Sequence, residues 1–442
     1  MKNIYLLLTL FCVGVSSSVT AQSAKMLTLD QAIDIALANN FDVKIQDQST
    51  ILAEGNITKA NAGYLPRVDA VAGGNYSNAF TEVDLRTFQP DPPMINLSEW
   101  GVETTNMNLG LEGQYTLWDG GRRRYRYQLL EGLSAIEKAK KQVVINGLIK
   151  GVSELYFEIV KLQNQVLILE ENVAVQTEQI QKLEDRNSFG KVNKLAILQA
   201  EANRNTDLSS IDNIQLVRAN LVADLKDLIG DVSDTEYTLI AADALAPMLS
   251  VEEVSTKLVA NNPQLKLANA GIALAEIDQL LAKSALKPVL NSFANFGYLY
   301  QQNDVQQLAQ LQNVGITVGL TARYNLFDGG INKRNIENAQ IKKDIEVLKL
   351  NQLSDNLVHQ AKKELATQRM IQAQLARETT NLGIFEANYD KVNERYKIGQ
   401  LPEITLREAQ LALTNAKITI ANLKADYQQS QMRLKQLMGN SF

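Results

Sequence analysis

The residue types that most often carry chemistry are scarce in this sequence. Its only histidine, His359, lies in the polar stretch LVHQAKKEL, and its only cysteine, Cys12, lies in an apolar stretch near the N-terminus. Soft-metal sites and histidine-based triads need more of these residues than the chain offers. Carboxylates are abundant, but on polar helices they carry little information. We therefore expect no catalytic residues, no metal site and no cofactor.

The N-terminus predicts export. Residues 1–21 read as a signal peptide, with an apolar run from Ile4 to Val15 and small residues before a cut after Ala21. A lipid anchor on Cys12 is not favoured, because Phe11 occupies the place of a small residue. The remaining sequence has no apolar run long enough for a spanning helix. Such an exported protein is periplasmic, secreted, or held in the outer membrane by strands.

The chain of 442 residues contains an internal duplication, so that features of its first half recur in its second half. Pro66 and Pro288 are related by a shift of 222 positions, whereas Gly190 and Gly399 are related by a shift of 209. The difference of 13 residues predicts a loop insertion in the first copy, around FQPDPPMINLSEW. We place the first repeat at 22–247 and the second at 248–442.

Each copy is expected to contain a pair of helices closed by a proline (Pro66 or Pro288), two strands and two long helices. The expected strands are 67–80, 104–118, 289–301 and 313–327. The expected long helices are 121–188, 191–229, 330–397 and 402–438.

The second strand of each copy shows a strict alternation of apolar and polar residues over about 11 positions, the length of a tilted strand that crosses a bilayer. The partner strands alternate less regularly. A half-buried soluble hairpin would alternate in the same way. The helices are amphipathic in their own right and no other sheet is evident to cover these strands, which favours a lipid-facing role. The residues predicted to face lipid are Met107, Leu109, Leu111, Ile316, Val318 and Leu320.

Two of the helices are expected to be very long and equal in length. At ~1.5 Å per residue each would reach ~100 Å. Between Val144 and Val173 apolar residues recur every three or four positions, which predicts a coiled-coil seam. Gly190 and Gly399 can adopt the left-handed turn at the far ends of these helices.

The strand-to-helix junctions repeat as QYTLWDGG and RYNLFDGG. Asp119 and Asp328 are placed to cap the long helices by accepting backbone N–H groups of the first turn. The glycines that let the chain turn from strand into helix are Gly120, Gly121, Gly329 and Gly330. The basic run RRRYR that follows the first junction fits the rim of a barrel near lipid headgroups better than a nucleic-acid site, since the net charge is −5.

Taken together, these features resemble the TolC-like outer membrane efflux protein (outer membrane factor) family, over nearly all of the sequence after the signal peptide. The resemblance rests on the duplication, the two hairpins, the junctions, and the tips followed by LQAEANRN and REAQLALTNA. It implies a mainly α protein with membrane β-strands: a homotrimer whose α-hairpins form a periplasmic tunnel and whose chains each give four strands to a shared 12-stranded barrel. Four strands alone would leave open edges, which lipid does not tolerate.

The resemblance also implies function and partners. It indicates a channel in the bacterial outer membrane, in contact with its lipid, that serves a tripartite efflux or type I secretion system. The partners would be a periplasmic adaptor and an inner-membrane RND or ABC pump, with no nucleic acid. An exported coiled-coil structural or adhesin-like protein without a channel remains the alternative.

Family members close the tunnel at the hairpin tips. Only some of the residues that do so in the family have counterparts in this sequence. Tyr396 matches the family's tyrosine, but Thr405 and Ala196 stand where some members have aspartate. Glu408 keeps an acid, so the implied constriction contains Glu408, Glu403 and Tyr396; a solvated helix face is the other reading of Glu408. The tip residues expected to dock an adaptor are Gly190, Lys191, Gly399, Gln400 and Leu401.

Overall fold

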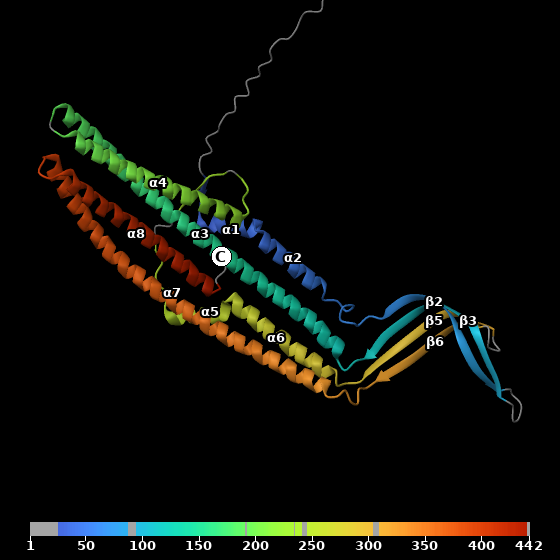
Figure 1. Ribbon diagram of the computed structural model, residues 1–442. Helices are drawn as coiled ribbons and strands as arrows, with labels where there is room; N and C mark the ends of the chain where they lie inside the picture. The colour runs from blue at the N-terminus through green and yellow to red at the C-terminus, as the bar shows by residue number, and fades with distance from the viewer. Residues whose placement is uncertain are drawn as a thin grey trace, which may run out of the picture.

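The computed structural model describes residues 25–86, 94–190, 192–233, 235–240, 245–303 and 309–439. The expected signal peptide and Lys191 lie outside the described residues. The molecule is elongated, with a layer of long helices continued at one end by a sheet of strands (Figure 1). Among the described helices, none is both long enough and apolar enough to cross a membrane.

The elements follow one order in both halves of the chain. The first half contains β1 (Lys25–Leu27), α1 (Leu29–Asn39), α2 (Phe41–Gly55), β2 (Arg67–Arg86), β3 (Met94–Trp118), α3 (Arg122–Ser188), α4 (Lys194–Ile229) and β4 (Tyr237–Leu239). The second half contains α5 (Val251–Asn261), α6 (Pro263–Ser284), β5 (Val289–Asn303), β6 (Gln310–Arg323), α7 (Ile331–Lys397) and α8 (Glu403–Leu437). The helices α3 and α7 have 67 residues each.

Five strand boundaries differ from the prediction: β5 ends at Asn303 instead of residue 301 and β6 starts at Gln310 instead of residue 313, and three differences are larger. β2 runs on to Arg86 instead of residue 80, and β3 starts at Met94 instead of residue 104, because the two strands continue to pair as far as Arg86 opposite Met94. Part of the insertion expected as a loop is therefore strand. β6 ends at Arg323 instead of residue 327. Arg323 is paired with Val289, the first residue of β5 after Pro288, so the residues beyond it have no partner strand in this chain.

The four long strands form one antiparallel sheet in the order β2-β3-β5-β6. The pairing aligns the apolar positions across strands: Leu111 lies opposite Phe296, which in turn lies opposite Ile316. The next row holds Glu112, Asn295 and Thr317, so one face of the sheet is apolar and the other polar. All six residues predicted to face lipid are exposed, from 50% at Leu111 to 72% at Ile316.

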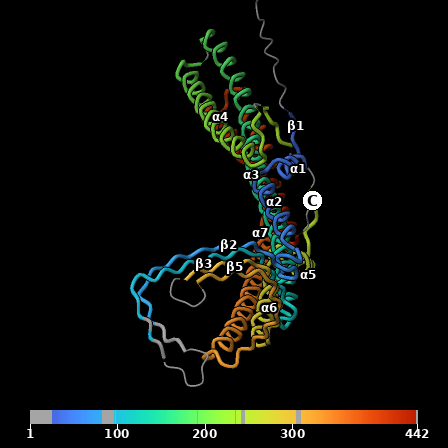
Figure 2. The backbone as a smooth tube through the Cα atoms, turned by 90° about the vertical axis from the view of Figure 1, so that its right-hand side faces the viewer, coloured from blue at the N-terminus to red at the C-terminus, as the bar shows by residue number. Residues whose placement is uncertain are grey.

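The helices repeat the order of the strands. α2 packs on α3, α3 on α6, and α6 on α7. The helical layer therefore has the order α2-α3-α6-α7, which matches the order β2-β3-β5-β6 of the sheet at its end. In Figure 2 the strands run off to one side of the helical part and the β2–β3 hairpin curves. Among the described residues, both layers end in edges without a further neighbour: α2 and β2 at one side, α7 and β6 at the other.

Two pairs of helices stack end to end: α4 on α2 in the first repeat and α8 on α6 in the second. The two joints have the same geometry. The Asn40 side-chain amide donates to the Leu228 carbonyl at the end of α4 (3.0 Å), and its oxygen accepts the Asp42 N–H at the start of α2 (2.9 Å). Asn262 joins α8 to α6 in the same way, through the Leu437 carbonyl (2.9 Å). The C-terminal glycine of the second joint, Gly439, has a φ of 68°, and a Cβ there would lie 2.3 Å from the Asn261 carbonyl oxygen. Only glycine fits such a joint.

The main core lies at mid-length, where α1, β1 and β4 cover α3 and the end of α4. The hydroxyl of Tyr156, which is almost fully buried, lies 2.7 Å from the Ile240 carbonyl oxygen and 2.9 Å from that of Leu27. Burial raises the pKa of Tyr156 to about 12, so the hydroxyl keeps its proton and remains a donor. A second core packs α5 against α7 and the end of α8. These cores hold both repeats together away from the tips and the strands.

Candidate functional site at the hairpin tips

The tips of the two helical hairpins lie side by side at the end of the molecule farthest from the strands (Figure 1). Gly190 and Gly399 turn the two tips with φ angles of 70° and 81°. Arg186, near the end of α3, donates to the Lys397 carbonyl oxygen at the end of α7 (2.9 Å). One hydrogen bond therefore joins the two tips of the same chain.

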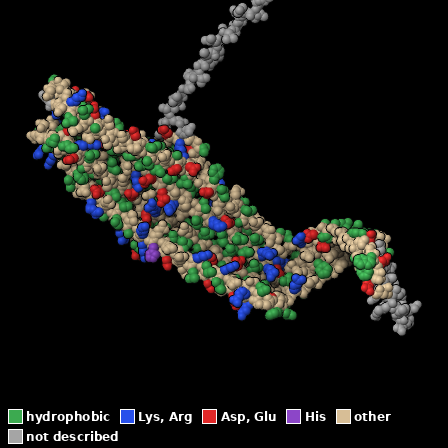
Figure 3. All heavy atoms as spheres, viewed as in Figure 1, with side chains coloured by type: hydrophobic (Ala, Val, Ile, Leu, Met, Phe, Trp, Pro, Cys, Tyr) green, Lys and Arg blue, Asp and Glu red, His purple; other side chains and the backbone are tan. Residues whose placement is uncertain are grey.

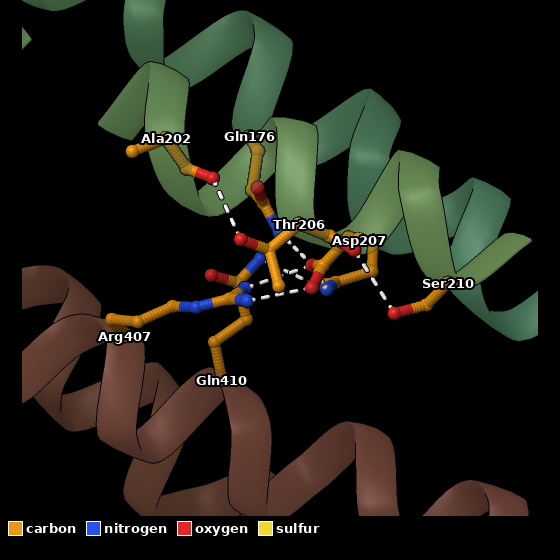
Figure 4. Close-up of polar contacts among 8 residues, drawn as sticks. Gln176, Ala202, Thr206, Asp207, Ser210, Arg407 and Gln410 are labelled. Carbon is orange, nitrogen blue, oxygen red and sulfur yellow. Dashed lines mark hydrogen bonds and ion pairs between the residues drawn. The ribbon is translucent and has the colours of Figure 1, made fainter. Parts of the chain in front are cut away.

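A buried polar cluster lies behind the tips, where α8 meets α3 and α4. Arg407 makes two hydrogen bonds to the Asp207 carboxylate, at 3.0 and 2.7 Å, with side-chain exposures of 10% and 8%. Asn172 and Gln176 on α3 also donate to Asp207, and Gln410 on α8 donates to Asn172. Figure 4 shows Arg407 on α8 reaching across to Asp207 on α4, with Gln410 beside it on α8. We call these five residues the polar clamp.

The polar clamp fixes the position of α8 relative to the first hairpin. A buried bidentate pair adds little net stability, because the desolvation of both charges offsets their attraction. It does make the packing specific, since any shift of α8 would leave a buried charge without its partner. The sequence analysis missed the polar clamp. The available signal was the polar pair Asn172 and Gln176, which interrupts the apolar seam of α3 where its residues remain buried.

Glu403 lies at the first turn of α8, close to the polar clamp. It is half-buried, and its Oε2 atom is enclosed without a hydrogen-bond partner. Together with Gln176, Arg407 and Gln410 it lines a small gap between the hairpins. Burial raises the pKa of the Glu403 carboxyl. The pKa of Tyr396 is also raised, first by burial and then by the nearby Glu403, so the structure brings these two site residues together.

Glu408 is not part of this group. It is exposed on α8 and shares a surface stripe with Ile404 and Leu411, whereas Arg407 and Gln410 point into the helix contacts. Within a single chain Glu408 therefore faces solvent. Any constriction built from it needs other copies of the chain.

The raised pKa of Glu403 predicts how the tip responds to pH. Between the ordinary carboxyl pKa and the raised one, the packed tip holds a proton that the separated tip has lost, so the packing weakens as pH rises through this window. Glu403→Gln should remove this dependence and make the tip more resistant to protease at neutral pH. The measurement is limited proteolysis of the tip segments from pH 4 to pH 8, with Glu394→Gln, an exposed acid on α7, as control. Equal pH profiles for wild type and Glu403→Gln would contradict the assignment.

The strand-to-helix junctions have the same geometry in both repeats. Asp119 accepts the N–H of Gly121 (3.1 Å) and of Arg123 (2.9 Å), and Asp328 accepts the N–H of Gly330 (2.9 Å) and of Asn332 (3.0 Å). The junction glycines Gly120, Gly121, Gly329 and Gly330 all have positive φ angles. Each aspartate thus satisfies N–H groups that a helix start leaves open.

Comparison with known proteins identifies the class. A profile described as "Outer membrane efflux protein" matches residues 32–231 and 254–440, one segment in each repeat. The chain belongs to the outer membrane efflux protein family. It is an outer-membrane efflux channel protein of the bacterial cell, and a coiled-coil scaffold or adhesin without a channel is not favoured.

Individual relatives are distant but matched along nearly their whole length. The solvent efflux pump outer membrane protein SrpC of Pseudomonas putida is 22% identical over 418 residues, which cover 94% of this chain and 85% of that protein. The cation efflux system protein CusC of Escherichia coli O157:H7 is 20% identical over 414 residues, with 93% and 85% covered. Among solved structures, VceC of Vibrio cholerae has a TM-score of 0.72 at 17% identity, with 94% and 96% covered. The open state of MtrE of Neisseria gonorrhoeae has a TM-score of 0.70 at 15% identity, with 93% and 88% covered. These structures share the fold of this chain.

Proposed function

We propose that three copies of this chain form one continuous duct, with the strands in the outer membrane and the helices in the periplasm. The observation that carries the proposal is the matching order of the two layers, β2-β3-β5-β6 and α2-α3-α6-α7. Both layers have open edges on the same two sides of the chain. When one edge of a chain pairs with the opposite edge of a second copy, the second copy still has one open edge, so the contacts repeat until they close into a ring or continue without end. We propose the closed ring of three.

The open edges carry side chains suited to burial. On α2 the exposed apolar residues Phe41, Ile45 and Leu52 lie on the edge of the layer, and on α7 the exposed residues Ile345 and Leu348 are three positions apart on one face. Unpaired β2 and β6 backbones could not remain open in lipid. Three copies would bring together twelve strands, whose apolar faces meet lipid and whose polar faces line a pore.

The position of the tips indicates which partners the duct contacts. The tips lie about 100 Å from the strands, the distance at which a periplasmic adaptor could hold them. We infer that an adaptor and an inner-membrane RND or ABC pump deliver the cargo, in tripartite efflux or type I secretion. The names of the relatives refer to solvents, cations and pyoverdine. Such variety on one fold suggests that the pump, and not the duct, selects the cargo.

Adaptor docking at the tips can be tested in cells. A photocrosslinking residue at Gln400 should capture a periplasmic adaptor, because this position is exposed at the turn between α7 and α8. Position 191, which follows Gly190 in the sequence, is expected to capture it as well. The same residue at Asp119, beside the strands, is the control and should capture none. Capture from position 119 but not from positions 400 and 191 would place the docking surface elsewhere.

We also propose that Glu408 lines the narrowest part of the trimeric duct. Three symmetry-related carboxylates would form a negative ring that favours cations over anions. Glu408→Gln should lower the cation preference and weaken block by multivalent cations in planar bilayers, with Glu394→Gln, an exposed acid on α7, as control. Unchanged selectivity and block would assign Glu408 to the solvated helix face.

A further inference from the structure

A basic groove lies on the helical layer next to the strands. Its walls are α3, which contributes Arg122 and Arg126, and α7, which contributes Lys342. The floor is the end of α6, where the small side chains of Ala282 and Ala285 leave room between the walls. The resulting cavity has a volume of about 780 Å³ and is lined also by the amides Asn332, Asn335 and Asn338.

The groove carries an uncompensated positive charge. Asp278 is the only acidic residue of its lining, against three cations. Neighbouring cations are neutralised: Arg123 pairs with Asp119 (3.1 Å) and Lys343 with Glu276 (2.8 Å). Within the described part of the chain, the side chains of Arg122, Arg126 and Lys342 take part in no salt bridge or hydrogen bond. Figure 3 shows how charged side chains of both signs otherwise intermingle over the helical part.

The spacing of these residues along α3 and α7 brings their charged groups to the same groove. Arg122 and Arg126 are one turn apart and therefore share a face of α3. Asn335, Asn338 and Lys342 are separated by three and four positions and share a face of α7. Guanidinium groups and side-chain amides are the donors that bind oxyanions well. Leu281 and Ile341 add apolar surface beside these donors.

We infer that the basic groove binds an amphiphilic anion. Its carboxylate, sulfate or phosphate head is held by Arg122, Arg126 and Lys342, and its apolar body lies along Leu281 and Ile341. Such an anion has two sources at this level of the molecule: an anionic phospholipid at the base of the strands, or an exported solute. The inference goes beyond the duct proposal, and binding at equilibrium does not depend on conduction.

The test is a fluorescence titration of the purified full chain with 1-pyrenesulfonate in a neutral maltoside detergent at low salt. Wild type should bind the probe, and Arg126→Gln combined with Lys342→Gln should weaken binding about tenfold or more, since two charge-assisted contacts are lost. Arg124→Gln combined with Lys333→Gln is the matched control, because it removes the same two charges from α3 and α7 outside the groove. Circular dichroism checks that the variants keep their helices. Equal affinity in the two double variants would overturn the inference.

The source of the anion is resolved by repeating the titration in lipid nanodiscs. If a phospholipid occupies the groove, discs of phosphatidylglycerol should exclude the probe and discs of phosphatidylcholine should not. If an exported solute is the natural occupant, the probe should bind in both lipids and be lost in both with the double variant of the groove. The same affinity for the probe in both lipids, in wild type and in the double variant of the groove alike, would also contradict the inference.

Discussion

Replacing Arg407 by alanine is expected to destabilise the packing of α8 against α3 and α4 by about 3–5 kcal/mol. The reason is that Asp207 would remain buried with its charge while losing both hydrogen bonds to the guanidinium. Asn172 and Gln176 would still donate to the carboxylate, but neither can neutralise it. The readout is hydrogen exchange of the tip halves of α4 and α8, which should open far more often in the variant.

The control for this prediction replaces the pair instead of one partner. Arg407→Met combined with Asp207→Asn should recover most of the lost stability, because no buried charge is left unpaired and the new amide oxygen at position 207 can still accept from Asn172 and Gln176. If Arg407→Ala alone exchanges like wild type, the polar clamp does not hold α8. If the double variant is as unstable as the single one, the clamp acts through packing and not through charge.

The second large effect is expected in the sheet. Leu111→Arg should cost about 2–4 kcal/mol of barrel stability, because it places a charge on the apolar face at mid-strand. Leu111 lies between Ala70 and Phe296 and is half exposed in the single chain, with no protein element covering it. The measurement is the yield and heat stability of the assembled protein extracted from membranes.

Glu112→Arg is the matched control for the sheet. It introduces the same side chain one residue further on, on the polar face beside Asn295. This variant should assemble nearly as well as wild type. Normal assembly of Leu111→Arg would contradict the assignment of the apolar face to lipid.

Sequence patterns predicted the parts of the fold that depend on local periodicity. The alternation around Leu109 and Ile316 predicted an apolar sheet face, since successive side chains of a strand point to opposite sides. The repeated glycines and Asp-Gly-Gly junctions predicted turns that only glycine or a capping aspartate can make. The motifs ANN and LxxLxG also occur once in each repeat, but no local pattern shows what they do. In the structure they are the two halves of the helix joints at Asn40 and Asn262.

Features that depend on contacts between distant segments were not predictable in this way. The length of β2 and β3 depends on their mutual pairing beyond the proline-rich insertion. The polar clamp depends on Asp207 and Arg407, which are 200 residues apart and look like ordinary surface charges in the sequence. The role proposed for Glu408 depends on other copies of the chain, so neither the sequence nor one chain's structure assigns it.

Ring closure at three copies is the central claim, and disulfide crosslinking between the open edges of the helical layer tests it most directly. The only cysteine, Cys12, lies in the expected signal peptide, so introduced pairs would have no background. One cysteine is placed on α2 at Ile45 or Leu52 and one on α7 at Ile345 or Leu348, and the chain is oxidised in the membrane. The account predicts species of one, two and three chains for at least one pairing, with nothing larger. Only single chains from every pairing, or an open-ended ladder beyond three, would contradict it.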